Sequence, residues 1–298
     1  MKKIFIGVDL HKHQITVCFL RADEKEKIVV YYFNDLGIKR FVEELKKLKD
    51  VGYELELAVE TTGNSEYFYN QIKSYVDKIL ILNTLKISPL MKSYKKTDKN
   101  DCRNISFFLS KNMLEGYSVN IPSEEAKALR RLLKSRFIFM KARVGIKNQI
   151  HGILLGNGEE TKKRFLTSKK GRDRLREMNY PEQKILNMLI NNIDKLDNQI
   201  NEIENMIETE IKKRGREHEI ITSIPGIGEI ISASIIAGID TIERFPDAKS
   251  LCAYVGLVPY VNNSGDEVRH GKITKTGPGY MRTALVQAVL SMLRSKER

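Results

Sequence analysis

The sequence predicts a mixed α/β domain, then a long helical region, then a smaller helical domain. Residues 1–115 alternate short β-rich runs with helical segments, whereas the chain from Ser123 onward shows helical periodicity over long stretches. Glycine and proline become frequent again after residue 215. These three observations divide the 298 residues into predicted domains at 1–115, 116–215 and 216–298.

The first domain is predicted to be a mixed sheet. Short connections join its first three β-rich runs, which favours an antiparallel meander over residues 4–8, 14–20 and 28–33. The rest alternates helix and strand: helix 38–48, strand 54–60, helix 64–75 and strand 78–82. Strands separated by helices are typical of parallel pairing, so the sheet combines both directions.

The helical region begins with a capping signal. Ser123 precedes two glutamates at the start of a long helix, and residues 127–147 contain no acidic residue. Further on, apolar residues recur at alternating spacings of three and four: Leu186, Leu189, Ile193, Leu196, Ile200, Ile203 and Ile207. This register predicts a coiled coil or a helical hairpin, and one amphipathic helix packed on its own domain is the alternative.

The last domain opens with a glycine-rich hairpin. Ile224-Pro-Gly-Ile-Gly228 lies between two helical segments and resembles a helix-hairpin-helix element. Backbone N–H groups at such a hairpin can bind a phosphate without reading sequence, which makes Gly226 and Gly228 candidate nucleic-acid contacts. A plain glycine-rich turn is the alternative.

Composition excludes several classes of protein. No apolar stretch approaches the ~18 residues of a membrane span, so we expect that the chain is not an integral membrane protein. The three cysteines are far apart and lack a CxxC pair, which argues against a disulfide framework or a structural zinc site. The N-terminus lacks the pattern of a signal peptide, so we expect a cytoplasmic protein. A net charge of +13 indicates a polyanionic partner.

Four acidic residues form a candidate metal site. Asp9 and Glu60 each end an apolar strand, and Asp98 and Asp101 lie three apart, so that they share one face of a helix. Four converging acids repel one another unless a divalent cation neutralises them, and oxygen ligands suit Mg²⁺ or Mn²⁺. By itself a strand-terminal Asp9 is often only a turn residue. Together, the order of the acids on a meander-first sheet resembles the ribonuclease H-like fold of RuvC-type Holliday-junction resolvases.

Basic residues surround the acids and extend along the helices. The candidate nucleic-acid contacts are Lys95, Lys96, Lys99 and Arg103; Arg130, Arg131, Lys134, Arg136, Lys141, Arg143 and Lys147; Lys162, Lys163 and Arg164; and Arg269, Lys272, Lys275 and Arg282. Isolated lysines are usually solvated. A helix with 21 consecutive acid-free positions favours phosphate binding, because ordinary surface helices mix both signs.

Ser264 is a candidate nucleophile. It precedes Gly265 in a polar turn, and cations lie nearby in the sequence. Attack on a phosphodiester needs an accessible hydroxyl and positive charge to stabilise the developing anion. A serine in an Asn-Ser-Gly turn is more commonly turn chemistry alone.

Taken in order, the motifs resemble the DEDD insertion-sequence transposases, whose relatives include Piv-type DNA invertases and recombinases guided by a bridge RNA. The resemblance is carried by Ile6-Gly-Val-Asp-Leu-His-Lys12, Val59-Glu-Thr-Thr-Gly63, Lys96-Thr-Asp-Lys-Asn-Asp101, Ile224-Pro-Gly-Ile-Gly228, Tyr254-Val-Gly-Leu-Val-Pro259 and Ser264-Gly with the stretch from Lys275 to Arg282. It departs at Asn263, Thr274 and Thr276.

The resemblance implies roles for these residues. Asp9, Glu60, Asp98 and Asp101 would be the catalytic, metal-binding acids, and Ser264 the nucleophile of a C-terminal transposase domain. It also implies a prokaryotic, nucleoid-associated protein that binds DNA ends, DNA target and a guide RNA. Homo-oligomers, dimers or tetramers with shared active sites, are implied too, and the heptads at 186–207 are their expected contact.

Three functions follow, in order of preference. The first is a recombinase that excises and inserts its own mobile element through a transient phosphoserine bond, with Mg²⁺ or Mn²⁺ at the acids. The second is a metal-dependent nuclease or resolvase without a covalent serine intermediate. The third is a non-catalytic DNA- and RNA-binding protein, whose binding would persist in EDTA.

Overall fold

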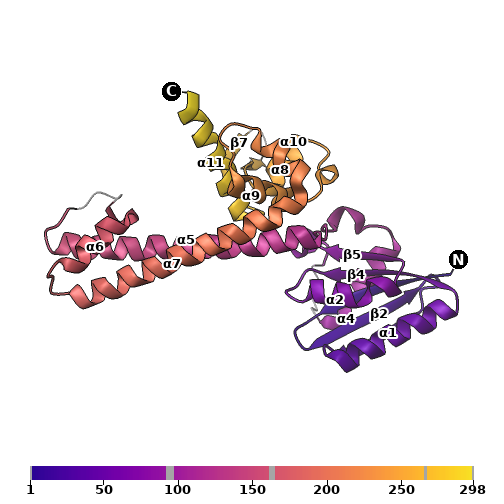
Figure 1. The fold of residues 1–298 in the computed structure, drawn as a ribbon. Coiled ribbons are helices and arrows are strands. Elements are labelled where there is room, and N and C mark those ends of the chain that lie inside the picture. Colours follow the sequence, from indigo (N-terminus) through magenta and orange to yellow (C-terminus); the bar gives the residue numbers. More distant parts are fainter. Residues whose placement is uncertain (1, 92–96, 161–164, 265–266, 297–298) are drawn as a thin grey trace. The chain divides into compact units, whose positions relative to one another are not determined.

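The computed structural model describes residues 2–91, 97–160, 165–264 and 267–296 (Figure 1). The chain divides into two compact units, Met1–Ile121 and Pro122–Arg298. The division lies close to the first predicted boundary, near 115. The second unit includes the predicted 216–298 domain together with most of the predicted 116–215 region. None of the described helices combines the length and the hydropathy that a bilayer span requires.

The first unit is built on one mixed sheet, and every strand predicted from the sequence is present. The strands are β1 (Lys2–Leu10), β2 (Gln14–Arg21), β3 (Glu26–Tyr32), β4 (Tyr53–Glu60) and β5 (Lys78–Leu82). Their spatial order is β3-β2-β1-β4-β5. Strands β1, β2 and β3 pair antiparallel, whereas β4 pairs parallel with both β1 and β5. This arrangement is consistent with the predicted ribonuclease H-like fold.

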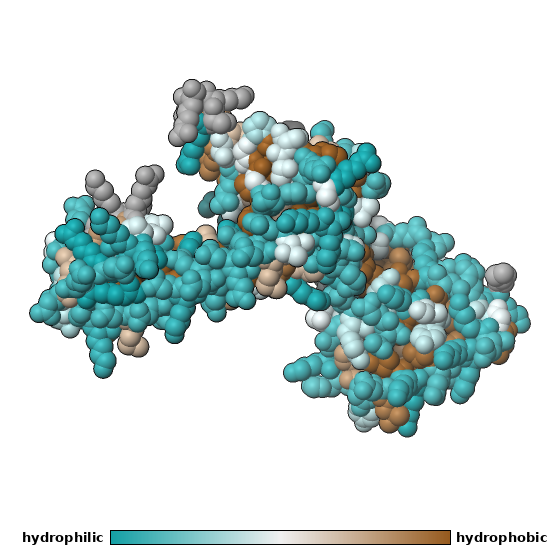
Figure 2. Space-filling view, viewed as in Figure 1, coloured by the Kyte–Doolittle hydropathy of each residue, from teal (hydrophilic) through white to brown (hydrophobic). Residues whose placement is uncertain are grey.

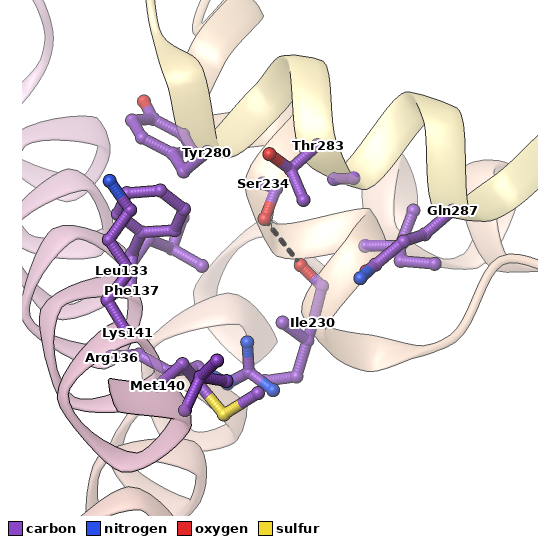
Figure 3. Close-up of a pocket in the computed structure, with 13 residues that line it drawn as sticks. Leu133, Arg136, Phe137, Met140, Lys141, Ile230, Ser234, Tyr280, Thr283 and Gln287 are labelled. Atoms are coloured by element: carbon purple, nitrogen blue, oxygen red, sulfur yellow. Dashed lines mark hydrogen bonds between the residues drawn. The ribbon is translucent and has the colours of Figure 1, made fainter. Parts of the chain in front are cut away.

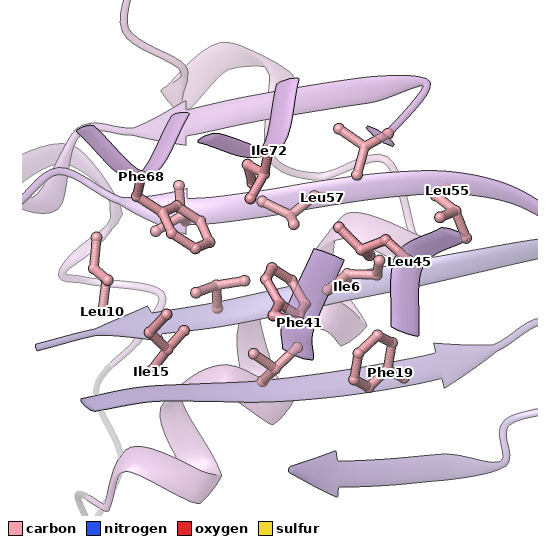
Figure 4. Close-up of a cluster of buried hydrophobic side chains, with 14 of the residues drawn as sticks. Ile6, Leu10, Ile15, Phe19, Phe41, Leu45, Leu55, Leu57, Phe68 and Ile72 are labelled. Carbon is pink, nitrogen blue, oxygen red and sulfur yellow. The ribbon is translucent and has the colours of Figure 1, made fainter. Parts of the chain in front are cut away.

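Helices pack on both faces of this sheet. They are α1 (Asp35–Asp50), α2 (Ser65–Ile72), α3 (Thr84–Ile87) and α4 (Asp98–Ser110), with 3-10 turns at Lys73–Tyr75 and Glu115–Tyr117. On one face, Phe41 of α1 and Phe68 of α2 pack on alternate residues of β1 and β4, such as Ile6 and Leu57 (Figure 4). On the other face, Ile105 and Leu109 of α4 form a second apolar cluster with β4 and β5.

Gly7 determines how closely α4 approaches the sheet. A Cβ atom at this position would lie 2.0 Å from the carbonyl oxygen of Cys102 and 2.5 Å from the amide nitrogen of Ser106. The backbone of α4 therefore packs directly on β1, which only a residue without a side chain allows. This contact fixes the first turn of α4 near the carboxyl end of β1.

The second unit is built on a helical hairpin. Helices α5 (Glu124–Gly156) and α7 (Gln183–Ile211) pack along each other, with α6 (Lys169–Glu177) and a 3-10 turn at Phe165–Thr167 between them in the sequence. Ser123 caps α5 as predicted, because its hydroxyl accepts a hydrogen bond from the amide of Ala126. Hydrophilic residues cover most of the hairpin surface visible in Figure 2.

The heptad positions of α7 pack inside the same chain. Leu186 and Ile193 contact a cluster with Ile150 of α5, and Ile207 contacts Leu129 at the other end of the hairpin. The helical hairpin, one of the two structures predicted from the register, is therefore present. The expectation that these heptads contact another protomer is wrong, because α5 of the same chain already covers that face.

The remainder of the second unit combines helices with a strand pair. Its elements are a 3-10 turn at Lys212–Arg214, α8 (Gly215–Thr222), α9 (Glu229–Ile239), a 3-10 turn at Ile242–Arg244, α10 (Ala248–Val255), β6 (Pro259–Ser264), β7 (Glu267–Ile273) and α11 (Gly279–Lys296). The antiparallel pair β6–β7 corrects the prediction of an entirely helical domain. Glycine and asparagine interrupt this segment, which gives it the sequence pattern of a polar turn.

Candidate functional site

The sheet brings Asp9 and Glu60 to neighbouring positions. Val8 of β1 is the register partner of Val59 in the parallel strand β4, so the next residue of each strand is an acid. Val8 and Val59 point into the core with α1 and α2, and side chains alternate along a strand. Asp9 and Glu60 therefore face the side covered by α4, at the carboxyl ends of parallel strands, where α/β sheets commonly bind ligands.

Helix α4 supplies the other two acids from its first turn. Thr97 caps the helix by accepting a hydrogen bond from the amide of Asn100 at 3.3 Å. Asp98 and Asp101 follow within that first turn, as predicted. The positive end of the helix dipole favours negative charge there, which partly offsets the repulsion between the two carboxylates.

The structure adds His11 to this cluster. Its Nε2 lies 3.1 Å from Oδ2 of Asp9 and 3.4 Å from Oδ1 of Asp98. One donor atom from each of these three residues falls within 4.8 Å of the other two. Gln14 of β2 donates a hydrogen bond to the second oxygen of Asp98, at 3.3 Å, and so orients that carboxylate. The other two predicted acids, Glu60 and Asp101, are not part of this three-residue group among the described residues.

The electrostatics of the site favour a bound cation. Burial raises the pKa of Asp9; the nearby His11 opposes this shift, and the charges of Asp98 and Asp101 add to it. Oδ1 of Asp101 is buried and has no hydrogen-bond partner among the described residues. A crowded set of carboxylate oxygens with one unpartnered acceptor fits a divalent metal ion, which would bind these oxygens and neutralise their charge.

His11 and Gln14 were not predicted as site residues. Both occur at the β1–β2 turn, where the amide of His11 donates to the carbonyl of Gln14. The sequence signal was present, because a histidine two residues after a strand-terminal aspartate can turn back toward it. A lone histidine carries too little information to be selected without the position of α4.

The basic residues predicted near the acids have different surroundings. Lys99 is exposed on α4. Arg103 pairs with Glu26 of β3, with a shortest distance of 2.6 Å, and also donates to Asn100. Lys95 and Lys96 lie outside the described residues. Arg103 is therefore held against the sheet edge, and Lys99 presents its charge to solvent.

The cations of α5 fall into two groups. Arg136 and Arg143 pair with Glu204 and Asp197 of α7 at 2.7 and 2.6 Å, and Arg130 donates to the carbonyl oxygens of Ala237 and Gly238 at the end of α9. These three arginines hold the unit together. The exposed group consists of Arg131, Lys134 and Lys141. Burial, then the charge of Arg143, lowers the pKa of the partly buried Lys147, and Lys162, Lys163 and Arg164 lie outside the described residues.

The predicted C-terminal contacts cluster around β6 and β7. Ser264 is the last residue of β6, in register with Glu267, and Arg269 of β7 is in register with Asn262. Lys272 and Lys275 are exposed, and Lys275 adopts a positive φ of 54°. Arg282 instead donates to the carbonyl oxygens of Val255 and Thr276 at 2.6 and 3.1 Å, so it tethers α11 to this loop.

The glycine-rich turn joins α8 to α9. Gly226 has a φ of 89°, and a Cβ atom there would lie 3.1 Å from Met292 of α11, so the turn packs closely on that helix. Gly228 is the N-cap of α9. Beside the turn, His218 of α8 lies 2.9 Å from the hydroxyl of Ser232 and 2.8 Å from the carboxylate of Glu229. Ser232 is fully buried, so this serine–histidine–acid row stabilises the helix pair and has no access for a substrate.

A pocket of about 260 Å³ lies between α5, α9 and α11. Figure 3 shows Phe137 and Lys141 of α5 on one side and Thr283 and Gln287 of α11 on the other. The ammonium group of Lys141 lies 4.8 Å from the centre of the Phe137 ring, a cation–π contact. The pocket contains none of the four acids, so it is separate from the candidate metal site.

The matches to known protein families together cover most of the chain. Residues 6–157 match the DEDD transposase family of IS110, and residues 218–298 match the family described as "Transposase IS116/IS110/IS902 family". The transposase for insertion sequence element IS1111A of Coxiella burnetii is 26% identical over 99% of this chain and 79% of its own length. The pilin gene-inverting protein of Moraxella bovis is 25% identical over 96% of this chain and 81% of its own.

These matches agree with the geometry. The match to the DEDD transposases spans just over half of the chain and includes Asp9, Glu60, Asp98 and Asp101. The second match includes α9, the β6–β7 pair and α11. Two matches in the expected order, together with relatives aligned over almost the entire chain, establish the relationship. The chain belongs to the IS110 family of DEDD transposases.

Proposed function

We propose that this transposase excises and inserts its own mobile element, and that it does so at the acid cluster of the first unit. The observation that carries the proposal is the convergence of three separate segments. Strands β1 and β4 present Asp9 and Glu60 on one face, and α4 brings Asp98 and Asp101 to the same face through the close contact at Gly7.

The acids would hold Mg²⁺ or Mn²⁺. Asp9 and Asp98 would supply oxygens beside His11. Asp101 lies outside that three-residue group, and its buried, unpartnered oxygen would supply another ligand after a side-chain rotation. A divalent ion so held polarises a phosphodiester and stabilises the charge that develops during its displacement. The residues of this chain fix the carboxylates: Gln14 orients Asp98, and the first turn of α4 places Asp98 and Asp101.

Ser264 would be the nucleophile. Its hydroxyl oxygen would form a bond to phosphorus as the bond from phosphorus to a deoxyribose oxygen breaks, and the hydroxyl proton would be transferred to the leaving oxygen. A deoxyribose hydroxyl of the other strand would later attack the same phosphorus. A new phosphodiester would form as the bond from phosphorus to the serine oxygen breaks, and the hydroxyl proton would return to Ser264. The family match over residues 218–298 and the position of Ser264 at the end of a hairpin strand support this role.

Nucleic acid would be bound through the exposed cations. Lys99 in the first unit, and Lys134 and Lys141 in the second, lie on exposed surfaces, and phosphate contacts of this kind give affinity without sequence specificity. A guide RNA would then select the target by base pairing while the protein grips its backbone. The net charge of +13 supports such a polyanionic partner. We place this activity in the bacterial cytoplasm, where element DNA is found.

A homo-oligomer, a dimer or tetramer, is part of the proposal. The heptad face of α7 is covered by α5, so the contact would use another surface. Sedimentation of the protein alone and with nucleic acid measures its oligomeric state.

The test is capture of a covalent intermediate. Purified protein is mixed with element-end DNA, the flanking non-coding RNA and Mg²⁺, then denatured in detergent and separated on a gel. We expect protein-linked DNA that is absent with Ser264→Ala. Asp9→Asn should reduce its formation at least about 1,000-fold, because loss of a metal ligand removes several kcal/mol of transition-state stabilisation. Wild-type rates in both variants would refute the proposed mechanism.

A metal-dependent nuclease or resolvase is the second candidate. The four acids belong to the first unit and Ser264 to the second, and a metal ion held by acids can activate a water for hydrolysis without a serine. The same gel separates the two candidates. Cleaved DNA with free ends and no linked protein, produced equally by Ser264→Ala, would identify the nuclease.

A further inference from the structure

His11 occupies the central position of the acid cluster. Its Nε2 is the atom that contacts both Asp9 and Asp98, at 3.1 and 3.4 Å, and its side chain is half exposed to solvent. A ring nitrogen in this position can donate a hydrogen bond to either carboxylate or, when deprotonated, bind a cation together with them.

The distances fit a shared ligand sphere. Two ligands at right angles on an ion about 2.1 Å from each lie about 3.0 Å apart. The separations between Nε2 and the two carboxylate oxygens are close to this value, so one ion can contact all three atoms after small side-chain rotations. Asp101 lies outside this three-residue group, but its charge acts on Asp9, and its buried oxygen has no hydrogen-bond partner among the described residues, which is a second sign that the site accepts a cation.

The surroundings of Asp98 support this interpretation. Gln14 donates to Oδ2 of Asp98 at 3.3 Å and to the hydroxyl of Thr16 at 3.1 Å. Thr16 is fully buried, so Gln14 is anchored in β2. The outer hydrogen bond leaves Oδ1 directed toward His11, which is how a metal-ligating carboxylate is commonly oriented by its neighbours.

We propose that His11 is a nitrogen ligand of the metal ion held by Asp9 and Asp98, and that it makes the site favour Mn²⁺ over Mg²⁺. This inference rests on the metal site of the proposed function. Mg²⁺ prefers oxygen ligands and retains its waters, whereas transition-metal ions accept imidazole nitrogen readily. A site of carboxylates alone would lack this preference.

Pulsed electron paramagnetic resonance of Mn²⁺ bound to the full chain tests the ligand directly. A coordinated imidazole gives a ¹⁴N coupling, which we expect in the wild-type protein and in His13→Gln, and which should be lost in His11→Gln. His13 lies in the same turn and is exposed, which makes it a matched control. Because His11 is also half exposed, His11→Gln should fold, and circular dichroism checks this.

Binding titrations with each ion test the preference. We expect His11→Gln to weaken Mn²⁺ binding by about 10–100-fold, on the scale of losses at metal sites, and to weaken Mg²⁺ binding much less. A ¹⁴N coupling that is absent from the wild type, or that persists in His11→Gln, would overturn ligation by His11. Equal losses for both ions would overturn the preference.

Asp9→Asn separates this inference from the proposed function. One outcome is that the wild-type chain binds Mn²⁺ without a ¹⁴N coupling and that Asp9→Asn abolishes this binding. The metal site then stands, and the role of His11 fails. If the wild-type chain binds neither ion, the metal site of the proposed function itself fails.

Discussion

Asp9 in the first unit and Asp240 in the second are aspartates largely removed from water, with side chains 17% and 3% exposed, yet their surroundings are opposite. Burial raises the pKa of Asp9, His11 opposes this, and two neighbouring acids add to the increase. Burial acts the same way on Asp240, but hydrogen bonds from Ser123 and nearby arginines outweigh it and lower its pKa.

The contacts explain the contrast. Asp240 accepts hydrogen bonds from the amide and the hydroxyl of Ser123, at 2.9 and 2.7 Å, and Arg214 lies 3.6 Å away. The Ser123 hydroxyl in turn accepts from the first turn of α5, so Asp240 links the ends of α9 and α5. A carboxylate whose partners are complete is structural. A carboxylate such as Asp9, with two other acids nearby, is stabilised when it binds a cation or a proton.

The largest stability effect should follow Asp240→Asn. The residue has a φ of 59°, which asparagine tolerates, so this change removes the charge while leaving the backbone unstrained. Arg130 and Arg214 would then lack their buried counter-charge, and we expect a loss of about 3 kcal/mol in the free energy of unfolding. Urea unfolding followed by circular dichroism measures it. Asp23→Asn, at an exposed pair, is the control, and an equally small change in both variants would contradict the structural role.

A smaller loss should follow Gly7→Ala. The added methyl group would meet the α4 backbone at 2.0 Å, so the helix must move, at a cost of about 2 kcal/mol. Because α4 carries Asp98 and Asp101, Mn²⁺ affinity should fall as well. Gly116→Ala is the matched control, since a Cβ there meets no atom within 4 Å. Unchanged metal affinity in Gly7→Ala would show that the acids do not depend on this contact.

The elements that form this site were largely predictable. Asp9 and Glu60 were predicted near strand ends because each follows an apolar run. The spacing of three between Asp98 and Asp101 predicted that they share one face of a helix. The heptad spacing of α7 predicted a coiled coil or a helical hairpin, and α7 forms such a hairpin with α5. These features depend on local periodicity, which a single sequence carries directly.

The pairing of charges was not predictable. Arg136 and Arg143 look like other cations of an acid-free helix until α7 brings Glu204 and Asp197 opposite them. Arg130 and Arg282 likewise look like phosphate contacts, but each donates to carbonyl oxygens of its own unit. Which charges are used inside the protein depends on contacts between distant segments, and no local pattern specifies those contacts.

Asp9→Asn should change stability in the opposite direction to Asp240→Asn. The folded pKa of Asp9 lies above its unfolded value, so the folded state loses stability as the pH rises through that interval. At pH 7 in EDTA, removing this charge should stabilise the chain by about 1 kcal/mol through relief of repulsion from Asp98 and Asp101. Below the unfolded pKa the gain should vanish.

Asp240 gives the contrasting pH profile. Its folded pKa is depressed, so its contribution is complete above the unfolded pKa and is lost as the pH falls through the folded value. Thermal unfolding of Asp9→Asn and Asp240→Asn from pH 3 to 7 therefore tests both expected pH dependences of stability. A destabilising Asp9→Asn at neutral pH would mean that His11 alone compensates the carboxylate, and that the cluster needs no cation.

The smallest effect should separate two cations on α5. Lys134 is exposed, whereas Arg136, two residues later, pairs with Glu204. Lys134→Gln should weaken RNA or DNA binding severalfold and reduce the slope of log affinity against log salt by about 1, with little change in unfolding. Arg136→Gln should leave that slope nearly unchanged and cost about 1 kcal/mol in stability. Filter binding between 50 and 300 mM salt, about the range where counterion release dominates, measures both slopes. Equal slopes in the two variants would mean that pairing inside the hairpin does not decide which charges of α5 contact nucleic acid.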